Sequence, residues 1–159
     1  LEDVEAHKFE AGKRVEAEVR LAGLELGSEK LGFNVTTVPP GKYATPFHAH
    51  HVNEEMFFVL DGHGTVRLAD GTHPIRAGDF VCVRAGRDSG HQIHNDSDAP
   101  LRYLAESTML EPEVVEYPDS GKIGVMSGFP PGRLPGPDSI LQVWRASDAV
   151  DYLDGEPKS

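Results

Sequence analysis

Apolar and polar residues alternate along several short stretches of this chain. The clearest stretch is Val15–Leu21, in which Val15, Ala17, Val19 and Leu21 occupy every second position. This period of two is typical of a β-strand with one buried face. We expect further strands at 31–38, 66–68, 72–75, 80–83, 101–104 and 140–144. Short strands at about ten-residue spacing, separated by glycine turns, predict an all-β sandwich or barrel.

Turn signals divide these strands. Pro39-Pro40-Gly41 ends the strand at 31–38, and Ala69-Asp70-Gly71 joins 66–68 to 72–75 as a hairpin. The apolar run 80–83 is short enough for a buried strand. Residues 1–14 are charged and weakly patterned, so we expect a loose arm or a short helix there.

The pattern fades in the last third of the chain. We expect the 159 residues to form one domain, with a core barrel at about 15–105 and a C-terminal appendage at about 106–159. The appendage carries Tyr117, Phe129 and Trp144, which need apolar surface to pack against. Either the outside of the barrel or a second subunit would supply that surface. We expect the last ten residues to fray.

Composition excludes several classes of partner. The formal net charge of −11 would repel nucleic acid and anionic membranes. No apolar stretch approaches the roughly 20 residues needed to span a bilayer. The single cysteine, Cys82, excludes an intramolecular disulfide and fits a reducing compartment. The sequence shows no signal-peptide pattern, so we expect a cytoplasmic protein.

Three histidines and a carboxylate form a candidate metal site. His48 and His50 are two positions apart, so in a strand they share one face. Glu54 and Glu55 follow, and His91 is a further candidate in a later stretch. Imidazole and carboxylate donors suit a divalent transition metal. An unbroken strand would place Glu54 on the histidine face, whereas a bend at Val52-Asn53 would place Glu55 there.

The other five histidines carry no such pattern. We expect His7, His63 and His73 to be ordinary surface or core residues. By strand parity, His51 and His94 face away from the metal.

Two motifs in this chain resemble those of the cupin family. The first comprises Gly41, His48, His50, Glu55 and Gly62, and the second comprises Gly78-Asp79, Gly86, His91 and Asn95. The resemblance covers about residues 31–104, and it is closest to small single-domain cupins. Two departures lie in the second motif, where Arg84 replaces the usual proline and four residues separate Gly86 from His91. Without that proline the loop 84–90 is less constrained, and we expect it to reach over the site.

The resemblance implies a fold and a ligand set. The fold is a cupin-type antiparallel β-barrel, also called a double-stranded β-helix or jelly roll, with irregular N- and C-terminal extensions. The motif spacing selects Glu55, together with His48, His50 and His91, as ligands to one divalent transition metal per chain, either Mn, Fe, Ni or Zn. Glu54 remains the alternative carboxylate.

The resemblance also implies two classes of function. The first is a metal-dependent enzyme acting on a small polar molecule, of the oxygenase or of the isomerase or lyase type. The second is a non-catalytic cupin that binds or stores a small sugar-like ligand. No catalytic residue stands out, although Glu54, Tyr43, Arg87 and Asp88 are conceivable acids or bases. Similar cupins commonly pair through outer strands, so we expect a homodimer.

Overall fold

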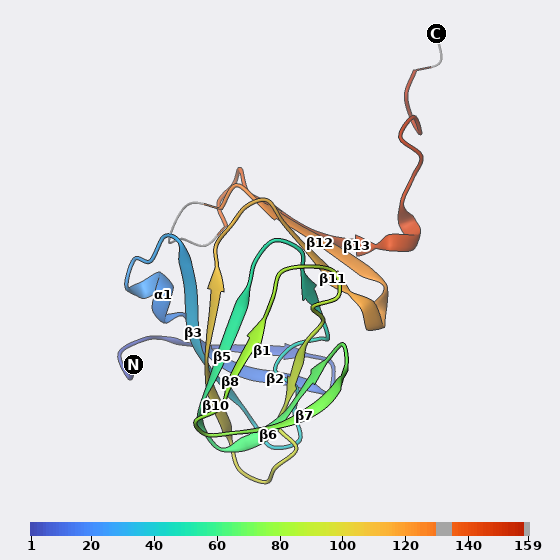
Figure 1. Ribbon diagram of the computed structural model, residues 1–159. Helices are drawn as coiled ribbons and strands as arrows, with labels where there is room; N and C mark the ends of the chain where they lie inside the picture. Colours follow the sequence, from blue (N-terminus) through green and yellow to red (C-terminus); the bar gives the residue numbers. More distant parts are fainter. Residues whose placement is uncertain (130–134, 158–159) are drawn as a thin grey trace.

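The computed structural model describes residues 1–129 and 135–157, and strands dominate them (Figure 1). The largest sheet has six strands in the order β1-β2-β3-β10-β5-β8. These strands are β1 (Ala6–Ala11), β2 (Val15–Arg20), β3 (Leu31–Val38), β10 (Leu101–Thr108), β5 (Glu55–Asp61) and β8 (Phe80–Val83). A four-residue helix, α1 (Ala22–Glu25), connects β2 to β3.

Two smaller sheets complete the barrel. One has the order β7-β6-β9 and the other has the order β13-β12-β11-β4. Their strands are β7 (Gly71–Arg76), β6 (His63–Leu68), β9 (Gln92–His94), β13 (Ile140–Arg145), β12 (Lys122–Ser127), β11 (Glu113–Tyr117) and β4 (Ala49–His50). Neighbouring strands in all three sheets run antiparallel. The expected all-β barrel is therefore confirmed.

The core lies inside the barrel. Its buried members come from all parts of the cupin-like region: Val38, Ala44, Phe57, Val59, Val66, Ile75, Val83, Ile93, Leu101 and Tyr103. Leu101 and Val59 have no exposed surface. Burying such side chains is the main favourable term that holds the sheets together.

Strand register determines which residues share the inner face near one end of the barrel. Tyr103, a core residue of β10, lies opposite Val59 of β5. Four residues further along β10, Ser107 lies opposite Glu55 of β5 and Gly32 of β3. Directly opposed residues in a sheet point to the same side. Glu55 and Ser107 therefore face the barrel interior.

The motif glycine Gly62 has a structural role at the opposite end of β5. Its φ of +82° lies in the left-handed region, and a Cβ added there would lie 2.5 Å from the Pro100 carbonyl oxygen. A larger residue would therefore strain the backbone and collide with the neighbouring strand connection. Glycine at this position allows β5 to turn directly into β6.

Two predictions at the edges of the large sheet were wrong. Residues 6–11 form β1, which pairs with β2 along its length, rather than a loose arm or helix. The reason is that β2 offers an open edge, which β1 covers although all six of its residues are exposed. Strand β8 has the predicted bounds, but it is an edge strand, and its Phe80 is 69% exposed, stacked on Phe58.

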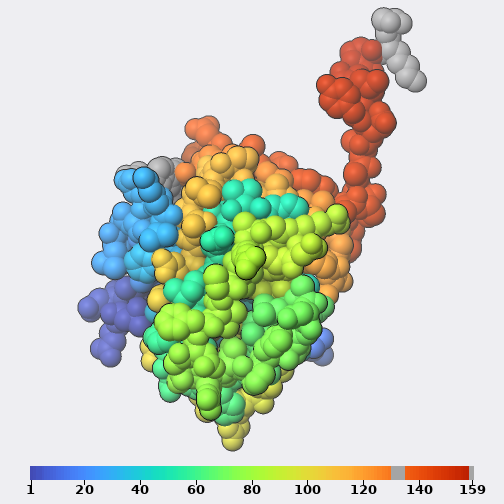
Figure 2. Space-filling view, in the orientation of Figure 1, coloured from blue at the N-terminus to red at the C-terminus, as the bar shows by residue number. Residues whose placement is uncertain are grey.

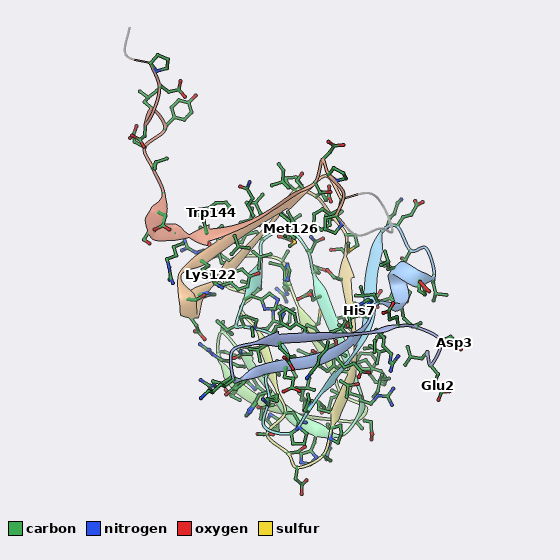
Figure 3. The ribbon with its side chains drawn as sticks, turned by 180° about the vertical axis from the view of Figure 1, so that it is seen from behind. Glu2, Asp3, His7, Lys122, Met126 and Trp144 are labelled. Carbon is green, nitrogen blue, oxygen red and sulfur yellow. The ribbon has the colours of Figure 1, made fainter. Side chains whose placement is uncertain are left out.

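The segment after residue 105, which we expected to be an appendage, also supplies strands to the sheets. Strand β10 continues to Thr108, and β11 pairs with β4 of the first motif, so the segment after 105 joins the barrel wall. Sequence pattern concealed β11 because its inward positions include a charged residue, Glu113, while Val114 and Val115 are adjacent. Figure 3 shows this C-terminal sheet from behind, with Met126 on β12 and Trp144 on β13.

The segment after Ala146 runs away from the body of the molecule (Figure 2). Tyr152, in this segment, is 95% exposed. Within the described residues, no helix is both long and apolar enough to cross a membrane.

Candidate metal centre

Four predicted ligands lie together at one end of the barrel. Ligand atoms of His48, His50 and Glu55 all lie within 4.8 Å of one another. His91 joins them through Glu55, because its Nε2 lies 2.8 Å from Glu55 Oε2. His50 Nε2 lies 3.5 Å from the same carboxylate oxygen. The structure thus brings together all four residues that the sequence selected.

Backbone pairing sets the position of two of these histidines. The His91 N–H donates to the His48 carbonyl at 2.9 Å, and the His48 N–H donates to the His91 carbonyl at 3.2 Å. This isolated antiparallel bridge joins segments 43 residues apart in sequence and places the two rings 4.4 Å apart between centroids.

Each histidine ring presents Nδ1 to an oxygen outside the cluster. His48 Nδ1 lies 2.9 Å from the Pro46 carbonyl, and His91 Nδ1 lies 3.3 Å from the Ser89 carbonyl. His50 Nδ1 lies 3.5 Å from Glu113 Oε2. An acceptor beside Nδ1 favours the tautomer protonated there, which leaves the Nε2 lone pair available to a metal.

Burial and the nearby ligand side chains shift the pKa values of His48 and Glu55. Burial of the ring, with His91 and His50 close by, lowers the pKa of His48 to about 4, so this imidazole is neutral near pH 7. Burial alone would raise the pKa of Glu55, but His91, His50 and His48 together lower it. A neutral imidazole beside an ionised carboxylate is the protonation pattern that metal ligation requires.

The residues present fit a divalent metal ion. Within the described part of the chain, Glu55 Oε2 is buried and has no aligned hydrogen-bond donor, although His91 Nε2 lies 2.8 Å away. A buried carboxylate oxygen without such a donor is costly. An ion held by Nε2 atoms and this oxygen would satisfy it, and the donor set of imidazoles and one carboxylate suits Mn, Fe, Ni or Zn.

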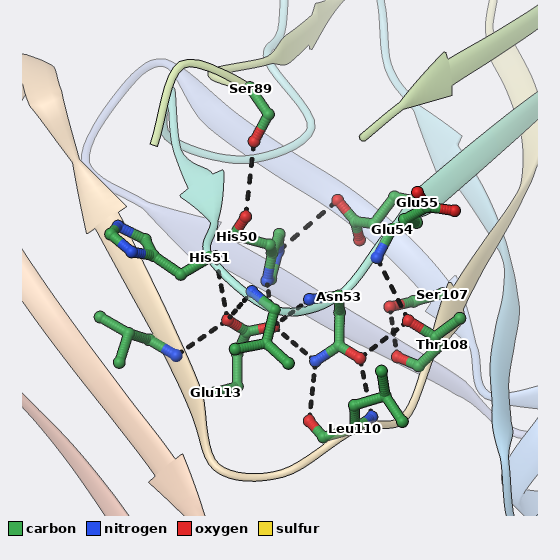
Figure 4. Close-up of polar contacts among 12 residues, drawn as sticks. His50, His51, Asn53, Glu54, Glu55, Ser89, Ser107, Thr108, Leu110 and Glu113 are labelled. Carbon is green, nitrogen blue, oxygen red and sulfur yellow. Dashed lines mark hydrogen bonds and ion pairs between the residues drawn. The ribbon is translucent and has the colours of Figure 1, made fainter. Parts of the chain in front are cut away.

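The structure places Glu55, rather than Glu54, beside the histidines (Figure 4). Glu54 is exposed, and its backbone is held by Thr108, whose N–H donates to the Glu54 carbonyl at 3.1 Å. Strand β4 ends at His50 and β5 begins at Glu55, so the strand is interrupted where Val52-Asn53 predicted a bend.

Sequence reasoning missed Glu113, which is only 3% exposed. Its Oε1 accepts hydrogen bonds from the backbone N–H groups of His51, Val52 and Val114 at 2.8–3.1 Å. Its Oε2 accepts the Asn53 backbone N–H at 2.9 Å and also the Asn53 side-chain amide (Figure 4). No spacing signal could have identified Glu113, because it lies 60 residues from Asn53.

The remaining histidines lie elsewhere. His7, His63 and His73 are exposed, as expected. His51 points to the other side of β4, where its Nε2 lies 3.2 Å from Glu116 Oε1. His94 stacks on Tyr43 with ring centroids 4.1 Å apart.

The loop 84–90 contacts the backbone of the first motif, and its reach over the site stays a prediction. The Gly86 N–H donates to the His50 carbonyl at 2.8 Å, and the Ser89 hydroxyl approaches the same oxygen at 3.4 Å. Arg87, one of the conceivable acids or bases, instead pairs with Glu116 at 3.2 Å. The loop therefore holds β4 from outside.

A cavity of about 500 Å³ reaches Glu55. Ser107, directly opposite Glu55, lines the cavity together with Asn34 and Ala105, and Phe33 and Met109 add apolar wall. This combination of apolar surface and a few polar groups is typical of a small-molecule site.

Comparison with known proteins identifies the family. The family model described as a cupin domain matches residues 34–105. An uncharacterised protein of Methanocaldococcus jannaschii is 30% identical over 67 residues, which are 42% of this chain. Those residues are 51% of that protein, so the chain spans about half the length of this curated relative.

Solved structures resemble a larger part of the chain. A protein of Acidithiobacillus ferrooxidans, proposed to be a sugar phosphate isomerase, is 27% identical with a TM-score of 0.72, covering 86% of this chain and 80% of its own. A sugar phosphate isomerase of the cupin superfamily from Silicibacter pomeroyi is 21% identical with a TM-score of 0.79, covering 93% and 92%. The second likeness shows the fold alone. Residues 34–105 of the chain therefore carry a cupin domain.

Proposed function

We propose that this protein binds one divalent transition metal through His48, His50, Glu55 and His91 and acts as a metal-dependent enzyme on a small polar molecule. One observation carries the proposal, namely the buried Glu55 oxygen among imidazole Nε2 atoms beside a cavity. A divalent ion bound there supplies a Lewis acid that polarises a carbonyl or hydroxyl oxygen.

The cavity lining offers groups that would orient such a molecule. Asn34 and Ser107 both line it, with Ser107 directly opposite Glu55, and both can hydrogen-bond to hydroxyl or carbonyl oxygens. The Thr36 hydroxyl donates to Asn34 Oδ1 at 2.7 Å, which fixes the orientation of the amide. Phe33 and Met109 would cover the less polar part of the ligand and limit access of water.

The Acidithiobacillus ferrooxidans relative supports an isomerase, because its proposed activity is sugar phosphate isomerisation. We propose that the substrate of this chain carries no phosphate. Among the described residues that line the cavity, none is Lys, Arg or His, while Glu29, Glu55, Glu106 and Glu111 are present. A phosphate dianion would be repelled by these carboxylates. We therefore propose an uncharged hydroxylated carbonyl compound, such as an unphosphorylated sugar, as the substrate class.

Metal content and turnover together test this function. Protein purified without a His-tag should contain about one transition-metal ion per chain by elemental analysis. Loaded with that ion, it should interconvert unphosphorylated aldoses and ketoses, followed by NMR, and lose this activity after chelation. Ligand binding without turnover would instead support a non-catalytic binding protein. Failure to take up Mn, Fe, Ni or Zn would contradict both functions.

We also propose that the protein is a homodimer formed through the C-terminal sheet. All six residues of β13 are exposed, including Leu141 at 56% and Val143 at 50%. Trp144 is 38% exposed on the same strand, which forms the open edge of its sheet. A second copy would bury this apolar surface with two-fold symmetry. Light scattering should report a dimer at micromolar concentration, and a monomer would contradict the proposal.

A further inference from the structure

We propose that Glu113 is a positioning residue of the metal site, acting through His50 and through the bend that brings Glu55 to the histidines. This inference rests on the proposed function, because the site it positions is the proposed metal site. Glu113 lies outside the matched cupin domain at residues 34–105 and belongs to the C-terminal sheet.

The surroundings of Glu113 require a carboxylate. Its two oxygens accept hydrogen bonds from four backbone N–H groups and from the Asn53 amide. A carboxylate has about four acceptor sites and no donor, so it can meet several converging donors at once. A glutamine would turn an amide group, itself a donor, towards some of these N–H groups. The site is therefore built for a negative charge next to His50.

The bend at residues 51–53 decides which glutamate faces the histidines. In an unbroken strand, Glu54 would share the face of His48 and His50. The N–H groups of His51, Val52 and Asn53 all donate to Glu113, and the His51 N–H also donates to the Val114 carbonyl of β11 at 2.9 Å. The bend shifts the parity by one residue, and Glu55 thereby takes the inner position.

Asn53 ties the same bend to the chain beyond β10. Its side-chain amide donates to the Leu110 carbonyl at 2.9 Å, and its Oδ1 accepts the Leu110 N–H at 2.7 Å and the Thr108 hydroxyl at 2.9 Å. Glu113 and Asn53 are both buried, so these contacts hold the bend in one geometry.

Glu113 also faces the ligand His50 directly. Its Oε2 lies 3.5 Å from His50 Nδ1, which is ion-pair distance without hydrogen-bond alignment, and among the described residues this buried nitrogen has no hydrogen-bond partner. His50 Nε2 lies 3.5 Å from Glu55 Oε2 on the other side of the ring. His48 and His91 have backbone carbonyls in the corresponding place, so His50 alone of the three has a carboxylate there. A carboxylate beside Nδ1 fixes the tautomer and increases the basicity of the ligating nitrogen.

The variant Glu113→Gln tests this role, with Glu116→Gln as the matched control. Glu116 lies on the same strand but faces outward, where it contacts His51 and Arg87. Affinity for Zn²⁺ should be measured by competition with a chromophoric chelator, and folding by circular dichroism. We expect Glu113→Gln to weaken Zn²⁺ binding about 10- to 100-fold. Glu116→Gln should leave the affinity within a few-fold.

A second measurement needs no variant. In metal-free wild-type protein, ¹⁵N NMR should show His50 protonated at Nδ1, and in Glu113→Gln the ring should shift towards the other tautomer. A purely structural role would lower the melting temperature without changing the Zn²⁺ affinity of the folded variant, and that result would overturn the proposal. Protonation of wild-type His50 at Nε2 would overturn it as well. If wild-type protein takes up no metal, the proposed function fails, whereas the tautomer still tests the contact with Glu113.

Discussion

Two regions build the metal centre, and they differ in how they contribute. Residues 48–55 supply three of the four proposed ligands within eight positions, in a spacing that a sequence motif can express. Strand β11 supplies Glu113, which shapes that segment from 60 residues away. Most of the ligands are therefore supplied by one short segment of the chain, whereas the geometry of that segment depends on a strand that is distant in sequence. The predictions below separate these two contributions.

The largest expected effect comes from removing a ligand, compared with removing a histidine close to it in sequence. His91→Ala should weaken metal binding by more than the roughly 100-fold that marks loss of a supporting contact, because it deletes a donor next to Glu55. His94→Ala should leave the affinity within a few-fold, because His94 stacks on Tyr43 instead. Metal titration of both variants checks this expectation. Equal losses would mean that the second motif contributes through its backbone rather than through His91.

An intermediate effect is expected for the bend itself. Asn53→Ala removes the side-chain hydrogen bonds to Leu110, Thr108 and Glu113 and leaves partly buried groups unpaired. We expect it to lower the free energy of unfolding by about 1–3 kcal/mol, measured by urea denaturation. Asn34→Ala, which removes one side-chain hydrogen bond from Thr36, should cost about 1 kcal/mol or less. A stability unchanged by Asn53→Ala would show that Glu113 holds the bend alone.

The smallest effect is expected for an exposed ion pair close to β11. Arg67 of β6 forms two hydrogen bonds, at 2.6 and 3.0 Å, with Asp119 just after β11. Both side chains are about half exposed, so Asp119→Asn should cost only about 0.2–1 kcal/mol near pH 7. Arg67 lowers the pKa of Asp119 below its ordinary 3.8. The stabilisation is therefore present above pH 3.8 and is lost as the pH falls through the lowered pKa. Thermal melts of both proteins should converge in strong acid.

Much of the barrel could be predicted from the sequence because its strands alternate or are bounded by strong turns. Strand β3 has the predicted bounds, and the hairpin of β6 and β7 lies where Ala69-Asp70-Gly71 predicted it. Strand β1 could not be predicted, because all its residues are exposed and no alternation marks a buried face. Strand β11 could not be predicted either, because one of its inward-facing residues is the charged Glu113.

The metal site was also predicted only in part from the sequence. Motif spacing was sufficient to select the four residues that the structure brings together, including Glu55 in preference to Glu54. It was not sufficient to explain that preference, because parity alone favoured Glu54. The physical reason is the bend at 51–53, whose N–H groups are held by Glu113. A buried carboxylate that accepts hydrogen bonds leaves no periodic signal, so only the folded chain reveals it.

The most direct test is a parallel metal titration of Glu54→Gln and Glu55→Gln, with circular dichroism to confirm folding. Glu55 faces the histidines and provides the anionic donor, so its substitution should weaken binding by more than the roughly 100-fold of a supporting contact. Glu54 is exposed, so its substitution should leave the affinity within a few-fold. If the two variants exchanged these effects, or if both bound metal as the wild type does, the proposed centre would be contradicted.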